Sequence, residues 1–269
     1  MREFRKVQKK ELPKLSALWQ LCFGDSTEDV KLFWDALFDE ISVFAAWEQA
    51  QPVAMLCALP VSLVDEVGEI LPAAYFYAVC THPNYRRQGL CAKLMAYSEA
   101  ALKKEGISLF CLVPAEKELF AFYEKMGYRN ALYHHTYDIP AQKGKGKITK
   151  INAESYQNLR QMQLYGRFAD YSLPLLSWQQ RLSEKSGAGL YRIELPEGIF
   201  CAAAEKHGAT LCIKELLPDC PEAAALLASH LGAQSARVRT EGESTAFGMA
   251  KALRGENIPE FSYFALAFD

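Results

Sequence analysis

The fold follows from one stretch of the sequence, CTHPNYRRQGLCAKLM, which runs from Cys80 to Met95. The apolar run YFYAVC, residues 75–80, leads into it and is typical of a buried strand. Beyond it, Leu90, Leu94, Tyr97 and Ala101 recur on one face, as expected of an amphipathic helix. Two arginines, a glutamine and a glycine therefore lie where a strand is followed by a helix.

Such a junction has the properties of an anion site. The first N–H groups of a helix lack internal partners, and the helix dipole adds about half a positive charge. Gly89 lets a ligand approach the backbone closely, and Arg86 and Arg87 can donate charge-assisted hydrogen bonds to a phosphate. The stretch therefore predicts a pyrophosphate site. The alternative, a solvated helix start with ordinary surface arginines, stays open.

The surrounding pattern predicts an α/β domain, α+β in its layering, with a mixed sheet. The apolar run at 107–113 makes strand, helix and strand a parallel unit. The other expected elements are a strand at the N-terminus, helices at 10–23, 27–39 and 116–126, a strand pair at 42–60, a strand at 70–81 and a final strand pair; the helix after the junction is expected at 87–105.

The second half of the chain weakly repeats the first. At an offset of 144 residues, one set of apolar positions matches another: Phe4, Val7, Leu12, Leu15, Leu18 and Ile148, Ile151, Tyr156, Leu159, Met162. A predicted hairpin follows in each half, at 45–57 and at 191–204. We expect domains at 1–140 and 148–269, joined by a Gly- and Lys-rich linker at 141–147. The order of strand, helix and hairpin is also common without any repeat.

Composition excludes several classes of protein. The net charge of −2 favours neither nucleic acid nor an anionic membrane, and no apolar stretch reaches the roughly 20 residues of a membrane span. The N-terminus has no signal-peptide core. The eight cysteines form no C-x-x-C pair and no ligand spacing with histidines, so we expect no metal site. Most of the cysteines lie in apolar runs, so we expect them to be small buried thiols. Unpaired thiols are typical of a reducing compartment, which predicts a cytoplasmic protein.

The junction resembles the acetyl-CoA loop of the GNAT N-acetyltransferase superfamily, [QR]-x-x-G-x-[GA]. Arg86 takes its first position and Gly89 its glycine, whereas Cys91 departs from the last small residue. A second block, LFAFYEKMGY at 119–128, resembles the later family helix with Y-x-x-x-G-[FY]. The asparagine often found seven residues before that tyrosine is Glu116 here. The two blocks, in order, cover about residues 3–140.

This resemblance implies a GNAT fold, a mixed central sheet flanked by helices, with acetyl-CoA as cosubstrate. It implies Tyr123 as the catalytic acid that protonates the leaving thiolate; the alternative is an aromatic that only packs. A backbone N–H near Val79 is expected to stabilise the oxyanion. The residues expected to bind acetyl-CoA are Val79, Thr81, Arg86, Arg87, Gln88, Gly89, Leu90, Cys91 and Ala92.

The second half carries no such loop. The segment from Lys214 to Ala225 has no R-x-x-G and puts acids where phosphates would lie. It resembles a GNAT-like domain that has lost cofactor binding, with a lipid-carrier-like fold as the alternative. We expect a closing strand at 261–268. The half would cover the acceptor cleft or build the surface of a homo-oligomer, and the first half alone is expected to bind acetyl-CoA.

The resemblance implies transfer of an acetyl group to a primary amine of a small molecule or peptide, with no nucleic acid or membrane as partner. The alternative is a non-catalytic acyl-CoA-binding sensor or partner-docking module, because the strand at 75–80 carries no acid. His82, or the upstream acids Asp65, Glu66 and Glu69, could act as general base, but so could a water chain or the chain's own C-terminus. A helix with Trp34, Asp35, Asp39 and Glu40 suits a cationic amine and is equally an ordinary amphipathic helix.

Overall fold

The computed structural model describes residues 2–253, 258 and 262–268. The chain divides into two compact units that alternate along the sequence. The first unit comprises Met1–Ser62, Ile70–Arg129 and Met249–Ile258; the second comprises Leu63–Glu69, Asn130–Gly248 and Pro259–Asp269. Each unit has its own hydrophobic core.

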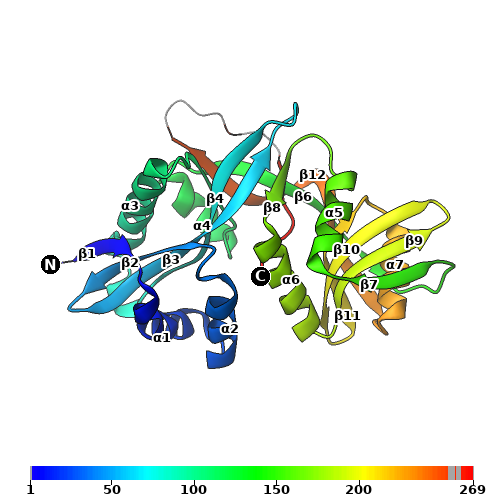
Figure 1. Ribbon diagram of the computed structural model, residues 1–269, viewed down its shortest axis with the longest axis horizontal. Helices are drawn as coiled ribbons and strands as arrows, with labels where there is room; N and C mark the ends of the chain where they lie inside the picture. Colours follow the sequence, from blue (N-terminus) through cyan, green and yellow to red (C-terminus); the bar gives the residue numbers. More distant parts are fainter. Residues whose placement is uncertain (1, 254–257, 259–261, 269) are drawn as a thin grey trace. The chain divides into compact units, whose positions relative to one another are not determined.

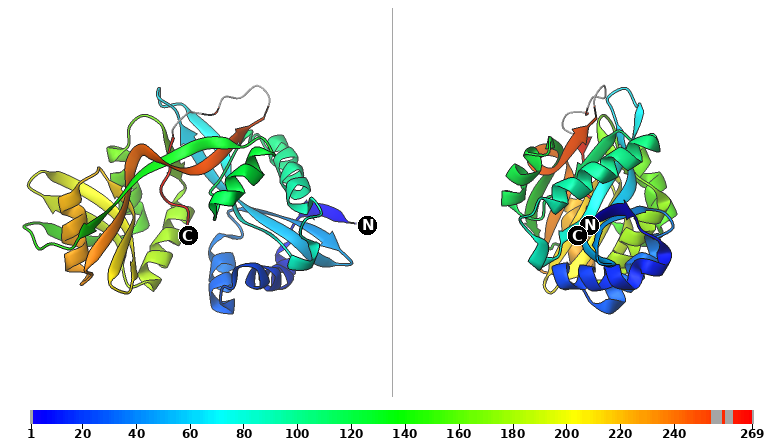
Figure 2. Two further views of the ribbon diagram at one scale, coloured as in Figure 1. Left: turned by 180° about the vertical axis from the view of Figure 1, so that it is seen from behind. Right: turned by 90° about the vertical axis from the view of Figure 1, so that its left-hand side faces the viewer.

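The first unit holds a sheet with helices on both faces. Its strands are β1 (Glu3–Lys6), β2 (Ser42–Glu48), β3 (Gln51–Val64), β4 (Ile70–Thr81) and β5 (Leu109–Leu112), joined by the end of β12 (Ser235–Ala252). Its helices are α1 (Leu12–Phe23), α2 (Thr27–Leu37), α3 (Leu90–Lys104) and α4 (Lys117–Glu124), with short 3-10 turns η1 (Lys9–Glu11) and η2 (Pro83–Tyr85). Helices α1 and α2 cover one face of the sheet, and α3 covers the other (Figures 1 and 2).

The sheet of the first unit is mixed. β1 pairs antiparallel with β2, and β2 with β3; β4 lies between β3 and β5 and runs parallel to β5. The edge beyond β5 is formed by Met249–Ala252 of β12, which pairs antiparallel with Leu109–Leu112. A segment from near the end of the chain therefore completes the sheet that the first half begins.

Helix signals in the sequence explain the local structure. The Ser26 hydroxyl accepts from the Asp29 N–H and caps α2, and Gly24 ends α1 in the left-handed conformation with φ 81°. Gly127, at φ 88°, reverses the chain after α4 in the same way. The turn at Gly127 is followed by Tyr128, which is buried in the core.

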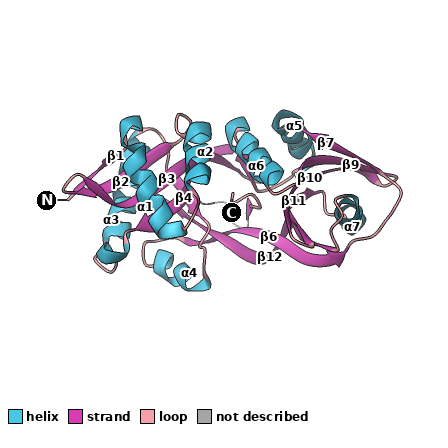
Figure 3. Cartoon of the chain, turned by 90° about the horizontal axis from the view of Figure 1, so that it is seen from below, coloured by secondary structure: helices cyan, strands magenta, loops and turns pink. Residues whose placement is uncertain are grey.

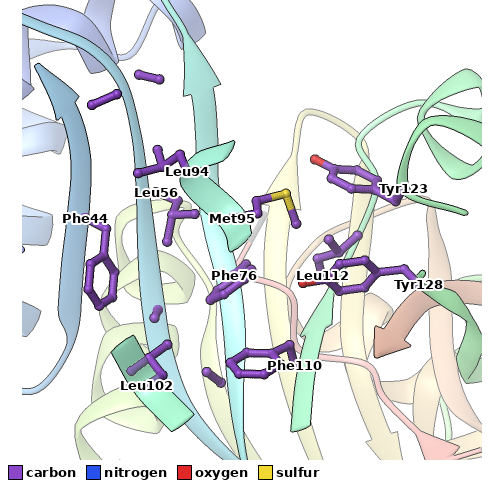
Figure 4. Packing of buried hydrophobic residues seen from close by; sticks show 14 of the residues in the cluster. Phe44, Leu56, Phe76, Leu94, Met95, Leu102, Phe110, Leu112, Tyr123 and Tyr128 are labelled. Atoms are coloured by element: carbon purple, nitrogen blue, oxygen red, sulfur yellow. The ribbon is translucent and has the colours of Figure 1, made fainter. Parts of the chain in front are cut away.

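In the core of the first unit, side chains of α3 and of the α4 region pack against the sheet. Figure 4 shows this for Met95, Leu112 and Tyr128. Met249 from the end of β12 is fully buried in the same cluster. Beside it, the Lys251 Nζ lies 2.6 Å from the Glu99 carboxylate, which also accepts from the Tyr128 hydroxyl at 3.0 Å. Burial and ion pairing thus both attach this late segment to α3.

From β7 to β12 the second unit has a similar order of elements to the first, except that β8 stands between its first two helices. Its elements are β6 (Arg129–Pro140), β7 (Lys147–Ile151), α5 (Ala153–Gln163), β8 (Phe168–Tyr171), α6 (Leu173–Lys185), β9 (Gly189–Leu195), β10 (Gly198–His207), β11 (Thr210–Leu217), α7 (Pro221–His230), most of β12, and β13 (Ser262–Tyr263). β7, β9, β10 and β11 pair antiparallel in that order, and β12 runs parallel to β11. α5 and α6 lie on one side of these strands and α7 on the other (Figure 3).

A buried ionic cluster lies between α5 and β11. The Arg160 guanidinium, which has no exposed surface, donates to the Glu215 carboxylate at 2.8 Å and to the Ala169 carbonyl at 2.7 Å. The Tyr156 hydroxyl donates to Glu215 at 2.6 Å. The charges are therefore paired and hydrogen-bonded, as buried charges must be.

The expected α/β fold, with a central sheet flanked by helices, is confirmed, and both hairpins form. Four details were wrong. The helix predicted from residue 87 begins at Leu90, the final strand pair of the first half is the single strand β6, and Lys214–Leu217 belong to β11. Of the predicted closing strand, only 262–263 form β13, 264–268 are irregular, and Phe261 lies outside the described residues.

Residues 141–146 connect β6 to β7 without regular structure. The division into domains at this segment stays a prediction. The compact units are not continuous in sequence: Leu63–Glu69 belong to the second unit and Met249–Ile258 to the first. None of the helices within the described ranges has the length and hydropathy of a transmembrane span.

Candidate active site

The strands β4 and β5 stop pairing before either of them ends. Their parallel pairing joins Ala73 to Leu109 and ends with Tyr75 opposite Cys111. The rest of β4, residues 76–81, extends beyond this register, and within it Ala78 adopts φ 50°, a left-handed conformation that is uncommon for alanine. On its other side the chain stays joined to β3, because the His82 N–H donates to the Val53 carbonyl at 2.9 Å. Beyond Tyr75, the backbone N–H and C=O groups of β4 near Val79 are therefore not paired with β5.

The chain turns from β4 into α3 through a loop whose shape depends on glycine. Arg86 is extended, Arg87 has φ 60°, and Gly89, at φ 70°, is the N-cap of α3 without any side-chain cap. A Cβ added to Gly89 would meet nothing within 4 Å, so space is open above its backbone. The N–H groups of Leu90, Cys91 and Ala92 begin the helix there, where uncapped N–H groups favour an anion.

The polar side chains of the loop are exposed. The Arg86 Nε donates to the Thr81 carbonyl at 3.2 Å. The Gln88 side chain is held by Arg2, whose guanidinium donates to the Gln88 Oε1 at 2.6 Å. Arg87 has no ion pair or hydrogen bond within the described residues and points its charge into solvent. The loop therefore presents one tethered and one unpaired guanidinium.

Tyr123, far from this loop in sequence, lies beside it in space. It is 7% exposed, and burial, followed by the Cys91 thiol, raises the pKa of its hydroxyl. Figure 4 shows the ring of Tyr123 lying above Tyr128, with its hydroxyl directed toward α3 at Met95. The hydroxyl is hydrogen-bonded to none of the described residues. It is therefore protonated at neutral pH and available to donate, while its ring also packs edge-on against Tyr128.

The remaining predicted residues lie along the same path. Leu90 is buried in the core, and Val79, Thr81, Cys91 and Ala92 are half-buried. The Cys91 sulfur lies 3.9 Å from the Met95 sulfur, and burial raises its thiol pKa to about 11. Cysteine thus serves as a small, packed residue at the position where the family pattern has glycine or alanine.

The candidate bases have other partners. The Asp65 carboxylate accepts from the N–H groups of Val67 and Glu69, at 2.9 and 2.8 Å, and Glu66 forms an ion pair with Arg167. The His82 Nδ1 accepts from the Asn84 N–H at 3.2 Å. The C-terminal Asp269 lies outside the described residues. Asp65 and His82 therefore stabilise turns, and Glu66 is in an ion pair, whereas Glu69 is exposed. The structure identifies none of these groups as the general base.

The helix considered as an acceptor wall is an ordinary amphipathic helix. The Trp34 ring is 4% exposed, and its Nε1 donates to the Ser16 hydroxyl at 3.0 Å. The two aspartates are paired with lysines, Asp35 with Lys31 and Asp39 with Lys9. Their charge is therefore neutralised and the aromatic ring belongs to the core.

Two features of the candidate site could not be recognised in the sequence. The kink at Ala78 has neither glycine nor asparagine to announce it, and Arg2 lies 86 residues from the glutamine that it holds. Across the described ranges, no group of three or more His, Cys, Asp or Glu side chains could hold a metal ion.

The chain is similar to known acetyltransferases in a family pattern and in its fold. Residues 3–131 match the family model of the acetyltransferase (GNAT) domain. Two similar solved structures are a probable N-acyltransferase of Enterococcus faecalis V583 and a GCN5-related N-acetyltransferase of Anabaena variabilis ATCC 29413. Both have a TM-score of 0.73 and 17% identity; the first covers 94% of this chain and 73% of its own, the second 93% and 72%. No curated protein matches the sequence.

Proposed function

Because residues 3–131 match the family model of the acetyltransferase (GNAT) domain, we propose that the protein is an acetyl-CoA-dependent N-acetyltransferase. It would move an acetyl group to a primary amine of a small molecule or a peptide by direct attack of the amine on the thioester. One observation carries the proposal: β4 and β5 separate after Tyr75, beside the uncapped start of α3. In the second unit the corresponding strands, β11 and β12, stay paired to Leu216, one residue before β11 ends.

The residues present fit acetyl-CoA, which supplies an activated acetyl group and a thiolate leaving group. The N–H groups at Leu90, Cys91 and Ala92, with Arg86 and Arg87, would bind the pyrophosphate, and Gln88 would support the loop. The free edge of β4 from Val79 to Thr81 would hydrogen-bond the pantetheine amides. A backbone N–H near Val79 would stabilise the oxyanion that develops during attack. No step in this scheme uses a metal.

Tyr123 would act as general acid. Its raised pKa keeps the proton on the hydroxyl at neutral pH, and its place beside Cys91 is where a thioester threaded past the loop would end. The incoming amine, with a pKa near 10, must lose a proton before it attacks. Positioning of that amine against the carbonyl supplies much of the acceleration.

We propose that the second unit is a GNAT-like domain that has lost its cofactor loop. The repeated order of strands and helices, with one parallel pair between β11 and β12, supports this origin over a lipid-carrier-like fold. It would serve to cover the acceptor or to form a homo-oligomer. The free thiols of all eight cysteines agree with a cytoplasmic protein.

The test is a screen of primary amines for CoA release from acetyl-CoA, followed by Tyr123→Phe with the accepted amine. The variant keeps the ring and removes the donor, so kcat is expected to fall on the order of 10²–10⁴ while acetyl-CoA affinity stays near normal. The matched control is Tyr97→Phe, an exposed tyrosine of α3, which is expected to keep wild-type kcat.

Two results would change the assignment. Wild-type kcat in Tyr123→Phe would make this residue a packing aromatic only. Tight acetyl-CoA binding without turnover of any amine would favour the second candidate, a non-catalytic acyl-CoA sensor or docking module, which the absence of an acid on β4 at residues 75–81 also favours.

A further inference from the structure

Two cysteines from distant parts of the sequence meet at the base of the loop between β4 and α3. Cys22 lies in the last turn of α1, and Cys80 is the next-to-last residue of β4. The Cys22 sulfur lies 3.7 Å from the carbonyl oxygen of Thr81, and the same oxygen accepts from the Arg86 Nε at 3.2 Å. Cys80 directly precedes Thr81 in β4, and the two thiols are close enough to affect each other's ionisation. The Thr81 carbonyl thus lies against the Cys22 thiol and the Arg86 guanidinium, next to Cys80 in the strand.

The two sulfurs differ in access and in ionisation. Cys22 is half-buried, whereas Cys80 is 9% exposed within the strand. The interaction with Cys80, followed by the charge of Arg86, lowers the pKa of Cys22 to about 7. The interaction with Cys22, followed by burial, raises the pKa of Cys80 well above its usual value. Cys22 is therefore the more accessible and more acidic of the two thiols, and Cys80 is its buried neighbour.

We propose that Cys22 and Cys80 form a peroxide-reactive dithiol, in which Cys22 is oxidised first and Cys80 closes a disulfide beneath the cofactor loop. An accessible, activated thiolate next to a resolving cysteine is the arrangement of redox-sensor cysteines. Nothing in this proposal depends on acetyl transfer, so it stands or fails separately from the proposed function.

The chemistry balances with a hydroperoxide as oxidant. The Cys22 thiolate attacks the outer peroxide oxygen, the O–O bond breaks, and the other oxygen leaves as an alcohol, or as water from hydrogen peroxide, leaving Cys22 as a sulfenic acid. The Cys80 sulfur then attacks the sulfenic sulfur, the S–S bond forms, and hydroxide leaves with the Cys80 proton as water. Two thiols and one peroxide give one disulfide, one alcohol and one water.

The other cysteines are poorer candidates for this reaction. Burial raises the thiol pKa of Cys57, Cys111 and Cys201, which are fully buried, and of Cys91. A raised pKa removes the reactive thiolate at neutral pH. Oxidation is therefore expected to select Cys22.

The expected rate follows from ionisation. At pH 7 a thiol of pKa about 7 is about half ionised, against about 1% at the ordinary value of 9.0. Nucleophilicity falls as the pKa falls, which removes part of that gain, so Cys22 is expected to react roughly five to ten times faster than N-acetylcysteine. Arg86→Gln should slow the reaction several-fold, whereas Arg87→Gln, in the same loop but without a contact to Cys22, should not.

The experiment treats the full chain with one equivalent of hydrogen peroxide at pH 7. Intact mass should fall by two hydrogen atoms, and non-reducing digestion should join the peptides of Cys22 and Cys80. In Cys80→Ser, Cys22 should stop at a sulfenic acid that dimedone traps; in Cys22→Ser, no bridge should form. Cys212→Ser, a change of another half-buried thiol, is the matched control and should leave rate and product unchanged.

The outcomes are separable. A Cys22–Cys80 bridge formed faster than N-acetylcysteine reacts supports the proposal. A bridge between other cysteines, a dimedone adduct on Cys80 in Cys22→Ser at the wild-type rate, or a Cys22 no more reactive than N-acetylcysteine overturns it. If Cys22→Ser fails to fold by its melting curve, Cys22→Ala answers the same question, and the wild-type digestion already identifies the bridge.

Discussion

In the first unit the chain passes from β4 to α3 through Arg86, Arg87, Gln88 and Gly89; in the second it passes from β11 to α7 through Pro218, Asp219 and Cys220. Both junctions follow a parallel strand and begin a helix. The first presents two cations and an uncapped glycine. In the second, Asp219 accepts from the Tyr137 hydroxyl at 2.8 Å and Glu222 adds a carboxylate in the first helical turn. An anion is attracted to one helix start and repelled from the other.

The strands behind the junctions differ as well. The pairing of β4 with β5 ends at Tyr75, well before the strand itself ends. The pairing of β11 with β12 continues to Leu216 opposite Thr240, one residue before β11 ends, and the Thr240 hydroxyl donates to the Leu216 carbonyl. The second unit is therefore closed where the first is open.

This difference teaches that the same order of strands and helices can end in junctions of opposite charge. The proposed cofactor site would need both a strand pair that separates early and a helix start that attracts anions. In the second unit, Arg160 and Tyr156 both donate hydrogen bonds to Glu215 near the end of β11. Four changes test the comparison, from the largest expected effect to the smallest.

The largest effect is expected from truncation to residues 1–140. This removes Met249–Ala252, leaving β5 without its antiparallel neighbour and Glu99 buried without Lys251. An unpaired edge and an unpaired buried carboxylate are both costly. We expect no cooperative melting transition by circular dichroism and no acetyl-CoA binding by calorimetry, contrary to what the sequence suggested for the first half alone. Full-length protein is the control; a folded, binding 1–140 fragment would show that the late strand is dispensable.

The next effect concerns the closed region of the second unit. Arg160→Met removes the cation and leaves Glu215 buried, so the free energy of unfolding should fall by about 3–5 kcal/mol. Urea unfolding followed by fluorescence measures it. Arg237→Met, which breaks an exposed pair with Asp138, should shift the urea midpoint little. Equal shifts in the two variants would mean that the buried cluster contributes no more to stability than an exposed ion pair.

The sequence predicted the elements that depend on local patterns. Apolar periodicity located α1, α2, α3 and α4 within a few residues, and a glycine follows the end of each except α2. The predicted start of α3 is three residues too early, because the residue types of Arg86–Gln88 are compatible with a helix. In the folded chain Arg87 and Gly89 adopt left-handed conformations, so the helix begins only at Leu90. Only tertiary structure decides such positions.

Long-range features escaped the sequence for a physical reason. The insertion of Met249–Ala252 beside β5 and the meeting of Cys22 with Cys80 join segments that share no local pattern. Motif spacing did place Tyr123 and the loop in one domain, but only the packing of α4 against α3 puts the hydroxyl near Cys91. Sequence spacing therefore placed the predicted site residues in one domain but did not reveal that β4 and β5 stop pairing at Tyr75.

The third change tests the open junction itself. Arg86→Glu should weaken acetyl-CoA binding by about 2–4 kcal/mol, because it removes a charge-assisted bond and adds repulsion. Gly89→Val should weaken it too, since valine resists φ 70° and its side chain fills the open space above the loop. Calorimetry with acetyl-CoA is the measurement, with Arg237→Glu in the second unit as the control. Unchanged affinity in both folded loop variants would remove the basis for distinguishing the two junctions.

The smallest effect concerns what holds each junction in shape. Arg2 donates to Glu48 at 3.0 Å and to Gln88 at 2.6 Å, so it ties the loop to the first strands. These groups lie near the surface, where such bonds contribute little, and Arg2→Gln should therefore raise the Kd for acetyl-CoA by less than about fivefold. Tyr137→Phe is the counterpart in the second unit: it frees Asp219 and should leave the Kd unchanged. A loss in Arg2→Gln as large as in Arg86→Glu would mean that the loop is shaped mainly by Arg2, and that the charges of Arg86 and Arg87 matter less than the position in which Gln88 is held.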